Sequence, residues 1–278
     1  MYIHYLPDNL FDKSERNIQL YDYNIVNTCV KNKIVLTKNV LSFLVEGTKQ
    51  LITHNATTLI NNQQFLLIKS GHCLMSENIA PSNSYRSMLL FFSDEAVLDF
   101  LKKYNINSAV EGATVPYHIC DYDGYIHQFV ESLKQIYQNV DYLNTPLLQV
   151  KFEEIMIYLM QKKGRAFLEH FLCVESDHVK QFKRVVESNT LNSLNLQELS
   201  FLCNMSLSTF KREFEKQYKE SPKKWFVDKR LEHAAFLLKT QYKRPIDIYG
   251  DVGFESLSSF TQSFKQKFGE TPKMYSSG

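Results

Sequence analysis

The sequence predicts an α+β fold, and three observations support that prediction. Up to about residue 93, short apolar runs alternate with turn-forming residues, whereas the later apolar residues recur with helical spacing. Residues 206–222 are repeated, with seven identities and no gap, at residues 256–272. With 278 residues, of which 44% are hydrophobic and 22% charged, the chain can bury a sizeable core.

The distribution of charge and cysteine indicates the environment of the protein. Residues 1–176 carry 15 Lys and Arg against 18 Asp and Glu, a net of −3, and residues 177–278 carry 17 against 12, a net of +5. A basic C-terminal third indicates a nucleic-acid-binding module attached to a part with another task. The five scattered cysteines are typical of free thiols in a reducing cytoplasm. No apolar run is long enough to span a bilayer, and residues 1–15 lack a signal-peptide pattern, so we expect a cytoplasmic protein with no membrane partner.

The first part of the chain is predicted to form strands. Its short apolar runs are separated by turn formers such as Glu46-Gly47 and Ser70-Gly71, a pattern typical of a sandwich or a small barrel. A barrel is the more attractive of the two because closure removes exposed strand edges. The main runs are Ile18–Tyr21, Val40–Val45, Gln50–Thr53, Phe65–Ile68 and Met88–Phe92.

Helices are predicted after residue 93, where three apolar stripes recur at helical spacing. The first stripe consists of Val97, Leu98 and Leu101, and the third, which begins after Pro146, of Phe152, Ile155, Met156 and Leu159. The middle stripe is continuous and must be covered either by the strand-rich part or by a second copy of the chain. Both alternatives stay open, and the candidate dimerisation residues are Ile126, Phe129, Leu133, Ile136 and Tyr137, with Val140 continuing the stripe.

The repeat describes a capped helix that has one aromatic face. Ser206 and Ser256 suit the N-cap position. Aromatic residues follow at intervals of four, which places them on one helical face: Phe210, Phe214 and Tyr218 in the first copy, and Phe260, Phe264 and Phe268 in the second. Pro222 and Pro272 come after each helix has ended.

A shorter apolar helix precedes each copy, so each pair is predicted to be a helix-turn-helix motif. The first short helix contains Leu196, Leu199 and Leu202 after Asn195, and the second contains Ile248 and Val252 after Pro245. The joins are Cys203–Met205 and Gly253–Glu255. A leading helix through Val179, Phe182, Val185 and Val186, and a linker helix through Trp225, Leu231, Ala234, Ala235 and Leu238, complete this part.

In such a motif the second helix enters the major groove, and here its polar face is left to contact bases because the aromatic face is buried. Lys and Arg can donate to guanine, Gln can pair with adenine, and the Thr methyl group suits thymine. The candidate base contacts are Ser208, Lys211, Arg212, Ser258, Thr261 and Gln262. The candidate phosphate contacts are Ser206, Ser256, Lys224, Arg230, Arg244 and Lys265, although Arg230 also suits an internal ion pair.

Residues 178–275 resemble the DNA-binding domain of the AraC/XylS family of bacterial transcription regulators. The resemblance is carried by Leu196…Leu199-Ser200, Ser206…Phe210-Lys211-Arg212…Phe214, Ser221-Pro222, Arg230-Leu231…Ala234…Leu237-Leu238, Gly253-Phe254, and Phe260…Phe264-Lys265…Phe268-Gly269…Thr271-Pro272. The sequence departs from the family pattern at Ser200, Tyr249, Pro245 and Ser276, where the family usually has Ala, Ala, Ile and Arg.

The resemblance implies seven helices with two helix-turn-helix units, used mostly for activation of transcription. It also implies a cupin-like N-terminal β-barrel with dimerisation helices. We therefore expect a regulatory domain at residues 1–172, a linker at 173–177 and a DNA-binding domain at 178–278. The implied partners are promoter DNA, RNA polymerase and a second copy of the chain. The N-terminal domain is expected to respond to a small effector, or alternatively to dock an antagonist or co-regulator protein and bind no small ligand.

A metal-dependent cupin enzyme fused to a DNA-binding domain is the third alternative. Such a site needs converging His side chains and a carboxylate, often with an HxH pair. The strand region offers His54 and His72 and no such pair, and nucleophile-elbow, P-loop and GxGxxG patterns are missing from the sequence. We therefore expect no catalytic activity, no metal and no cofactor.

Overall fold

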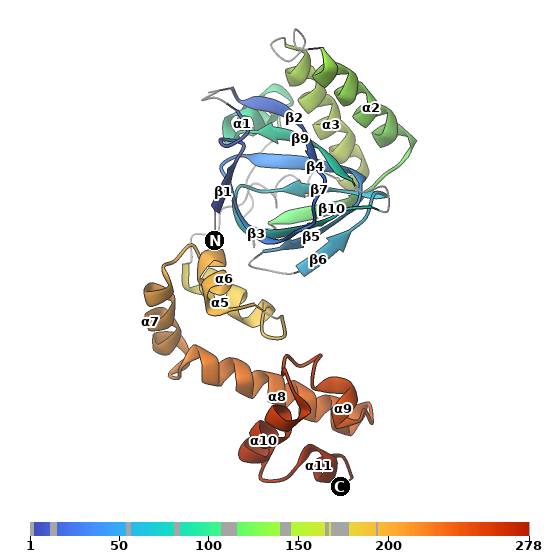
Figure 1. The fold of residues 1–278 in the computed structure, drawn as a ribbon. Helices are drawn as coiled ribbons and strands as arrows, with labels where there is room; N and C mark the ends of the chain where they lie inside the picture. The colour runs from blue at the N-terminus through green and yellow to red at the C-terminus, as the bar shows by residue number, and fades with distance from the viewer. Residues whose placement is uncertain are drawn as a thin grey trace. The chain divides into compact units, whose positions relative to one another are not determined.

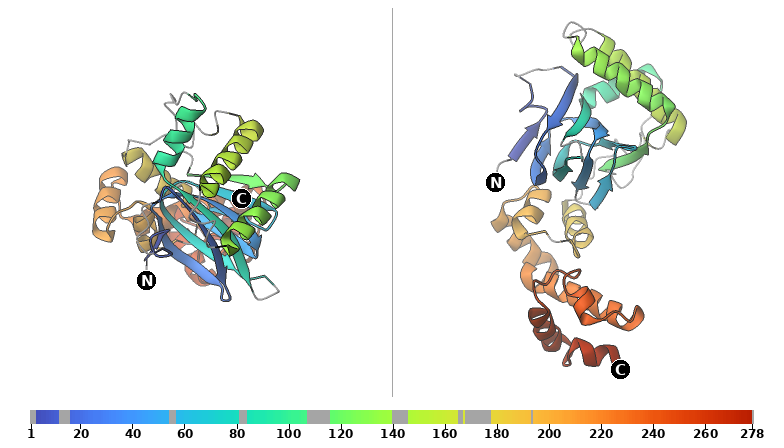
Figure 2. Two further views of the ribbon diagram at one scale, coloured as in Figure 1. Left: turned by 90° about the horizontal axis from the view of Figure 1, so that it is seen from above. Right: turned by 45° about the vertical axis from the view of Figure 1, so that its right-hand side comes forward.

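The computed structural model describes residues 3–11, 16–53, 57–80, 84–106, 116–139, 146–164, 167, 178–192 and 194–277. The chain divides into two compact units, residues 1–181 and 182–278 (Figures 1 and 2). The predicted linker at residues 173–177 and the predicted stripe residue Val140 lie outside the described residues. No helix in the described ranges is long and apolar enough to cross a membrane.

The N-terminal unit contains two five-stranded sheets. The first has the order β1 (Ile3–Leu6), β3 (Cys29–Leu36), β8 (Gly71–Asn78), β5 (Thr48–Ile52) and β6 (Thr57–Ile60). The second has the order β10 (Tyr117–Asp121), β7 (Gln64–Ile68), β4 (Asn39–Glu46), β9 (Tyr85–Phe92) and β2 (Ile18–Ile25). The pairs are antiparallel except for β1 with β3.

The α+β class is confirmed, but the prediction of a closed barrel is wrong, because the described strands pair into two separate sheets. The chain changes sheets at Gly47, between β4 and β5, where φ is 90°. A Cβ atom there would lie 2.6 Å from the carbonyl oxygen of Asn78, so only glycine fits this corner. The expectation that only helices follow residue 93 is also wrong, since β10 adds to the edge of the second sheet beside β7.

The second sheet is the middle layer and is buried on both faces. Along β4, Val40 and Leu44 belong to the core between the two sheets, while Leu41 and Phe43 belong to the core beneath the helices. This alternation follows from the two-residue period of a strand. It explains why β4 is apolar at nearly every position.

Three helices cover the outer face of the second sheet: α1 (Asp94–Lys103), α2 (Gly124–Gln138) and α3 (Leu147–Lys163) (Figure 1). Ser93 caps α1, and Asp123 caps α2. Aromatic rings join the layers, with Phe129 at 5.6 Å from Phe43 between ring centroids. The predicted stripes of α1 and α3 are buried except for Leu98, which is 49% exposed.

The predicted dimerisation residues lie in the core of the chain itself. Ile126, Phe129, Leu133 and Ile136 of α2 are buried against the second sheet, and Tyr137 packs against the same cluster. Tyr137 also contacts Tyr21 of β2 edge-on, at 6.2 Å. These side chains form the intramolecular packing that the sequence left as one of two alternatives. A dimer through α2 would have to use its remaining, exposed face.

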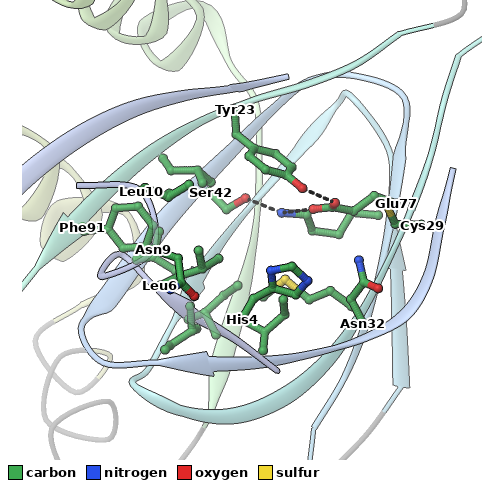
Figure 3. A pocket seen from close by; sticks show the side chains of 17 residues that line it. His4, Leu6, Asn9, Leu10, Tyr23, Cys29, Asn32, Ser42, Glu77 and Phe91 are labelled. Atoms are coloured by element: carbon green, nitrogen blue, oxygen red, sulfur yellow. Dashed lines mark hydrogen bonds and ion pairs between the residues drawn. The ribbon is translucent and has the colours of Figure 1, made fainter. Parts of the chain in front are cut away.

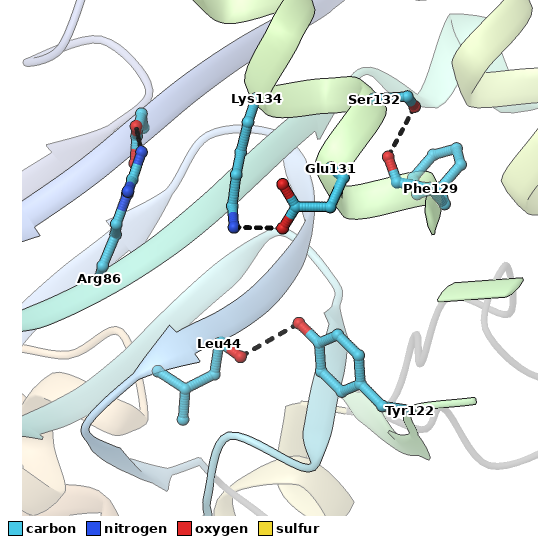
Figure 4. Close-up of polar contacts among 8 residues, drawn as sticks. Leu44, Arg86, Tyr122, Phe129, Glu131, Ser132 and Lys134 are labelled. Carbon is cyan, nitrogen blue, oxygen red and sulfur yellow. Dashed lines mark hydrogen bonds and ion pairs between the residues drawn. The ribbon is translucent and has the colours of Figure 1, made fainter. Parts of the chain in front are cut away.

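Polar contacts join the elements of this layer (Figure 4). The Tyr122 hydroxyl donates to the carbonyl oxygen of Leu44 at 3.1 Å, which ties the segment before α2 to β4. On α2, Lys134 pairs with Glu131 at 2.6 Å. Arg86 of β9 donates to both carboxylate oxygens of Asp22 on β2, at 2.9 and 2.6 Å, and this pair raises the pKa of Arg86.

Seven helices are described in residues 178–277, as the resemblance implied. They are α5 (His178–Ser188), α6 (Leu196–Leu202), α7 (Leu207–Tyr218), α8 (Pro222–Thr240), α9 (Pro245–Ile248), α10 (Leu257–Phe268) and α11 (Pro272–Ser277). The predicted leading helix is α5, and the predicted linker helix is α8. Pro222 and Pro272 take the first positions of α8 and α11, where the missing N–H costs nothing.

The packing of α2 gives a stability prediction. Phe129→Ala should lower the free energy of unfolding by about 3–5 kcal/mol, because it removes a buried ring and leaves a cavity beneath α2. Gln128→Ala, at the neighbouring exposed position, should change it by less than about 0.5 kcal/mol. Urea unfolding followed by circular dichroism measures both, and equal losses would show that α2 does not pack as described.

Candidate nucleic-acid interface

The first helix-turn-helix unit consists of α6, a tight turn and α7. Asn195 and Glu198 form a capping box at the start of α6. The turn places Asn204 at a φ of 54°, and the backbone N–H of Met205 donates to the carbonyl oxygen of Ser200 at 2.9 Å. Ser206 Oγ then accepts from the backbone N–H of Thr209 at 3.2 Å, so the predicted N-cap is confirmed.

An aromatic cluster holds α7 in place. Phe210 and Phe214 are fully buried, and their ring centroids lie 5.8 Å apart. Phe182 of α5 contacts Phe210 at 5.4 Å, and Trp225 of α8 contacts Phe214 at 5.6 Å. Rings on three helices therefore fix the rotation of α7 about its own axis.

That rotation exposes the polar face of α7, which is the face predicted to contact bases. Ser208, Lys211 and Arg212 are exposed, and Glu215 continues the same polar face. Ser208 Oγ lies 3.0 Å from Ser206 Oγ, so the first turn of α7 presents adjoining hydroxyl groups beside its free backbone N–H groups. This combination of donors at the N-terminal end suits phosphate oxygens and base edges.

The second unit repeats this construction around α10. Ser256 Oγ accepts from the backbone N–H of Ser259 at 3.2 Å, which confirms the second predicted N-cap. Phe260 and Phe264 are fully buried, with their ring centroids 5.7 Å apart. Both long helices end at a left-handed residue, which is Gly269 here and Lys219 in the first unit.

The two turns differ by one residue. In the second unit the backbone N–H of Phe254 donates to the carbonyl oxygen of Tyr249 at 2.9 Å, the counterpart of the bond from Met205 to Ser200. The short helices therefore correspond at an offset of 49 residues, whereas the long helices correspond at 50. Glu255 is the extra residue before the second cap, and α9 spans four residues against seven in α6.

The reading face of α10 borders a shallow hollow. Ser258 and Gln262 are exposed, Thr261 is half-buried, and Lys265 is exposed one turn further on. These four side chains and Leu257 line the hollow. The methyl group of Thr261 and the side chain of Leu257 give it an apolar wall, while Gln262 and Lys265 supply hydrogen-bond donors.

Five of the six candidate phosphate residues are exposed, and the sixth, Arg230, is turned inward. Ser206, Ser256 and Lys265 are exposed at the long helices. Lys224 is exposed and pairs loosely with Glu220 at 3.3 Å. Arg244 is also exposed and donates to both carboxylate oxygens of Asp247, at 2.8 and 2.9 Å, which raises its own pKa and lowers that of Asp247.

Arg230 is turned into the C-terminal unit. Its guanidinium group donates to the carbonyl oxygen of Asn192 at 3.1 Å, ahead of α6, and its Nε atom is buried. Burial lowers the pKa of Arg230. A Cβ atom at Gly253, in the second turn, would lie 2.9 Å from the Arg230 guanidinium. Arg230 therefore spans from the segment before the first motif to the turn of the second, and phosphate contact would require it to leave these positions.

The N-terminal unit contains a cavity that the sequence did not predict. Its volume is about 440 Å³, and it lies between the two sheets (Figure 3). Lys49 of β5 is buried there, 3.0 Å from Ser42 Oγ and 3.8 Å from a carboxylate oxygen of Glu77. The Tyr23 hydroxyl donates to Glu77 at 3.0 Å. The signal in the sequence is a lysine two residues before the buried Leu51, which places it on the same, inward face of β5.

Burial changes the acid–base properties of this cluster. It lowers the pKa of Lys49 and, together with the charge of Glu77, raises that of Tyr23. Burial also raises the pKa of Cys73 to about 12, so this thiol stays protonated and unreactive at neutral pH. Within the described ranges, no group of three or more His, Cys, Asp or Glu side chains is placed to hold a metal ion.

Comparisons with known proteins agree with the two-part organisation. Residues 39–171 match the family model of the ExsA N-terminal regulatory domain, and residues 200–277 match a helix-turn-helix domain model. The chain is similar to the HTH-type transcriptional regulator ExsA of Pseudomonas aeruginosa, with 32% identity over 124 residues that cover 44% of this chain and 45% of that protein. It is also similar to the virulence regulon transcriptional activator VirF of Yersinia enterocolitica, with 30% identity over 148 residues that cover 53% of this chain and 54% of that protein.

The chain spans about half the length of the curated relatives it matches. Among solved structures, ToxT from Vibrio cholerae matches at 16% identity with a TM-score of 0.42, over 94% of this chain and 98% of that chain. The relatives matched in sequence are transcription regulators and not enzymes.

The contact between Arg230 and Gly253 gives a second prediction. Gly253→Ala should destabilise the C-terminal unit by about 1–3 kcal/mol, because φ is 79° there and the added Cβ would collide with the Arg230 guanidinium. Gly250→Ala is the matched control, since a Cβ there meets nothing within 4 Å. Urea unfolding followed by the emission of Trp225, the chain's one tryptophan, measures the difference. Equal effects of the two substitutions would contradict this packing.

Proposed function

The chain belongs to the AraC/XylS family of bacterial transcription regulators, and we propose that it binds promoter DNA sequence-specifically through α7 and α10. The observation that carries this proposal is the repeated unit. Each copy caps its long helix with serine, buries two phenylalanines and leaves a polar face exposed. A helix held in this way presents one fixed set of side chains to the major groove.

The proposed contacts divide by chemistry. Ser208, Lys211 and Arg212 on α7 contact base edges in one groove segment, and Ser258, Thr261 and Gln262 on α10 contact those in the next. Ser206, Ser256, Lys224, Arg244 and Lys265 contact phosphates and fix the position of the protein on the duplex. For Arg244, phosphate contact competes with its ion pair to Asp247. Arg230 contacts the segment before the first helix-turn-helix motif and the turn of the second, and it contributes to DNA binding by holding the two motifs in position.

The regulatory direction we propose is activation, in the cytoplasm, by a homodimer that engages RNA polymerase. The similarity to a virulence regulon transcriptional activator supports this direction. The dimer would use exposed faces of the helical layer, because the apolar stripe of α2 is already buried against the second sheet.

We further propose that the N-terminal unit, residues 1–172, controls the DNA-binding unit by binding a small effector. The cavity between the sheets supports this form of control, because polar side chains are buried against an otherwise apolar lining. Control by a docked antagonist or co-regulator protein is the second candidate. Residues 39–171 match a regulatory-domain model, which does not say what kind of molecule the domain binds. The test described next therefore also detects a protein partner.

Genome-wide mapping of bound DNA tests the proposal directly. The full chain and a chain that lacks residues 1–172 are each crosslinked in cells, and the bound fragments are sequenced. Enrichment of one shared motif upstream of a limited set of genes supports sequence-specific promoter binding. Uniform recovery of the genome would contradict it, and a partner protein that crosslinks only to the full chain would favour the second candidate.

Arg212 gives a prediction about specificity. Arg212→Ala should weaken binding to the mapped operator by about 1–3 kcal/mol and relax the preference at one base pair, because an exposed guanidinium can pair with a guanine edge. Lys216→Ala, one turn further along α7, should leave the base preference unchanged. Electrophoretic titration on operator and random DNA separates the two roles. Equal losses on both DNAs would mean that Arg212 contacts only phosphate.

The division of the chain gives another prediction. A fragment that lacks residues 1–172 should stay soluble and still shift operator DNA, because the helical unit has its own aromatic and aliphatic cores. Circular dichroism and electrophoretic titration check both properties. A fragment that is unfolded, or that is folded but does not bind operator DNA, would contradict the proposed domain boundary.

A further inference from the structure

The cavity in the N-terminal unit contains a pair of buried opposite charges. Side-chain exposure is 3% for Lys49 and 8% for Glu77, and the two charged groups are 3.8 Å apart. A charge removed from water is costly unless an opposite charge compensates it. The pair therefore satisfies the charge balance of the cavity before any ligand enters.

Hydrogen-bonding capacity remains at this pair. The ammonium group of Lys49 has three donors, of which one reaches Ser42 Oγ at 3.0 Å. Its 3.8 Å separation from Glu77 is longer than a hydrogen bond, although the charges still attract. Glu77 accepts from the Tyr23 hydroxyl through one oxygen. The cluster can therefore bind an uncharged oxygen of a ligand without losing its own contacts.

The rest of the lining is mainly apolar, with His4, Asn9 and Asn32 as its further polar side chains. Figure 3 shows Tyr23, Ser42 and Glu77 meeting around dashed polar contacts, with Leu6, Leu10 and Phe91 on another side of the cavity. Further apolar side chains come from both sheets: Ile34, Leu36, Val40, Ile68, Met75 and Leu89. A volume of about 440 Å³ is within the range of roughly 300–1,000 Å³ found for small-molecule sites.

We propose that this cavity binds an uncharged, largely apolar small molecule whose carbonyl or hydroxyl oxygen accepts a hydrogen bond from Lys49. An anionic ligand would place its charge beside Glu77, and a cationic one would place its charge beside Lys49. Either would add a charge that the Lys49–Glu77 pair does not compensate. This inference rests on the proposed control by a small effector and names its chemical class.

Two naphthalene dyes that differ in charge test the inference on the full chain. Prodan is an uncharged ketone, and anilinonaphthalene sulfonate is an anion. Prodan should bind with one-to-one stoichiometry, seen as a blue shift of its emission. The sulfonate should bind at least about tenfold more weakly, because it brings a negative charge that the Lys49–Glu77 pair does not compensate.

Variants locate the bound dye. Val40→Phe adds a ring to the cavity lining and should abolish Prodan binding, while Val30→Phe, at a position 65% exposed on β3, should not. The double variant Lys49→Met with Glu77→Met removes both charges together and leaves neither unpaired. It should weaken Prodan binding about tenfold while thermal unfolding stays cooperative. It also keeps the test decisive if Val40→Phe fails to fold.

Three results would overturn the inference. Sulfonate binding as tight as that of Prodan, and equally sensitive to the cavity variants, would exclude the uncharged class. Prodan binding that no cavity variant affects, or no binding at all, would exclude the site. Electrophoretic titration of the same preparations on operator DNA, carried out without dye, separates this failure from failure of the proposed DNA binding.

Discussion

Burial of the second sheet on both faces is the constraint on which the N-terminal unit depends. Because β4 and β9 sit in the middle of that sheet, side chains of one parity must meet the helices and those of the other parity must meet the first sheet. The helical side is filled by rings such as Phe43 and Phe129. The side between the sheets is filled less completely, and that is where Lys49 and Glu77 are enclosed.

In the C-terminal unit, burial of one side of a helix likewise determines which side chains are exposed. Aromatic residues at intervals of four bury one face of α7 and of α10, so the opposite face of each helix is exposed to solvent. Serine caps at both starts and left-handed residues at both ends fix where each helix begins and stops. The polar faces are thus positioned by packing on the opposite, aromatic side of each helix, and a substitution of an exposed residue on them can change recognition with little effect on stability.

Local patterns predicted most of this architecture, and long-range geometry accounts for what they missed. The repeat, the caps and the buried stripes depend on neighbours in the sequence, so they could be predicted from it. The edge strand β10 pairs with β7, about fifty positions earlier, and its five residues give too short a pattern to identify. The corner at Gly47 and the inward turn of Arg230 depend on Asn78, Asn192 and Gly253, which no local window contains. The same holds for the meeting of Lys49, Tyr23 and Glu77.

The length of the linker helix α8 sets the spacing between the two helix-turn-helix motifs. Its 19 residues rise about 28 Å along one unbroken axis, with Trp225 packed on the first motif near one end and Leu238 in the core of the second near the other. One inserted residue would lengthen that axis by about 1.5 Å and rotate everything beyond it by about 100°. Variation among related regulators should therefore alter the composition of this helix far more freely than its length, because its length sets the distance and the rotation between the two helix-turn-helix motifs.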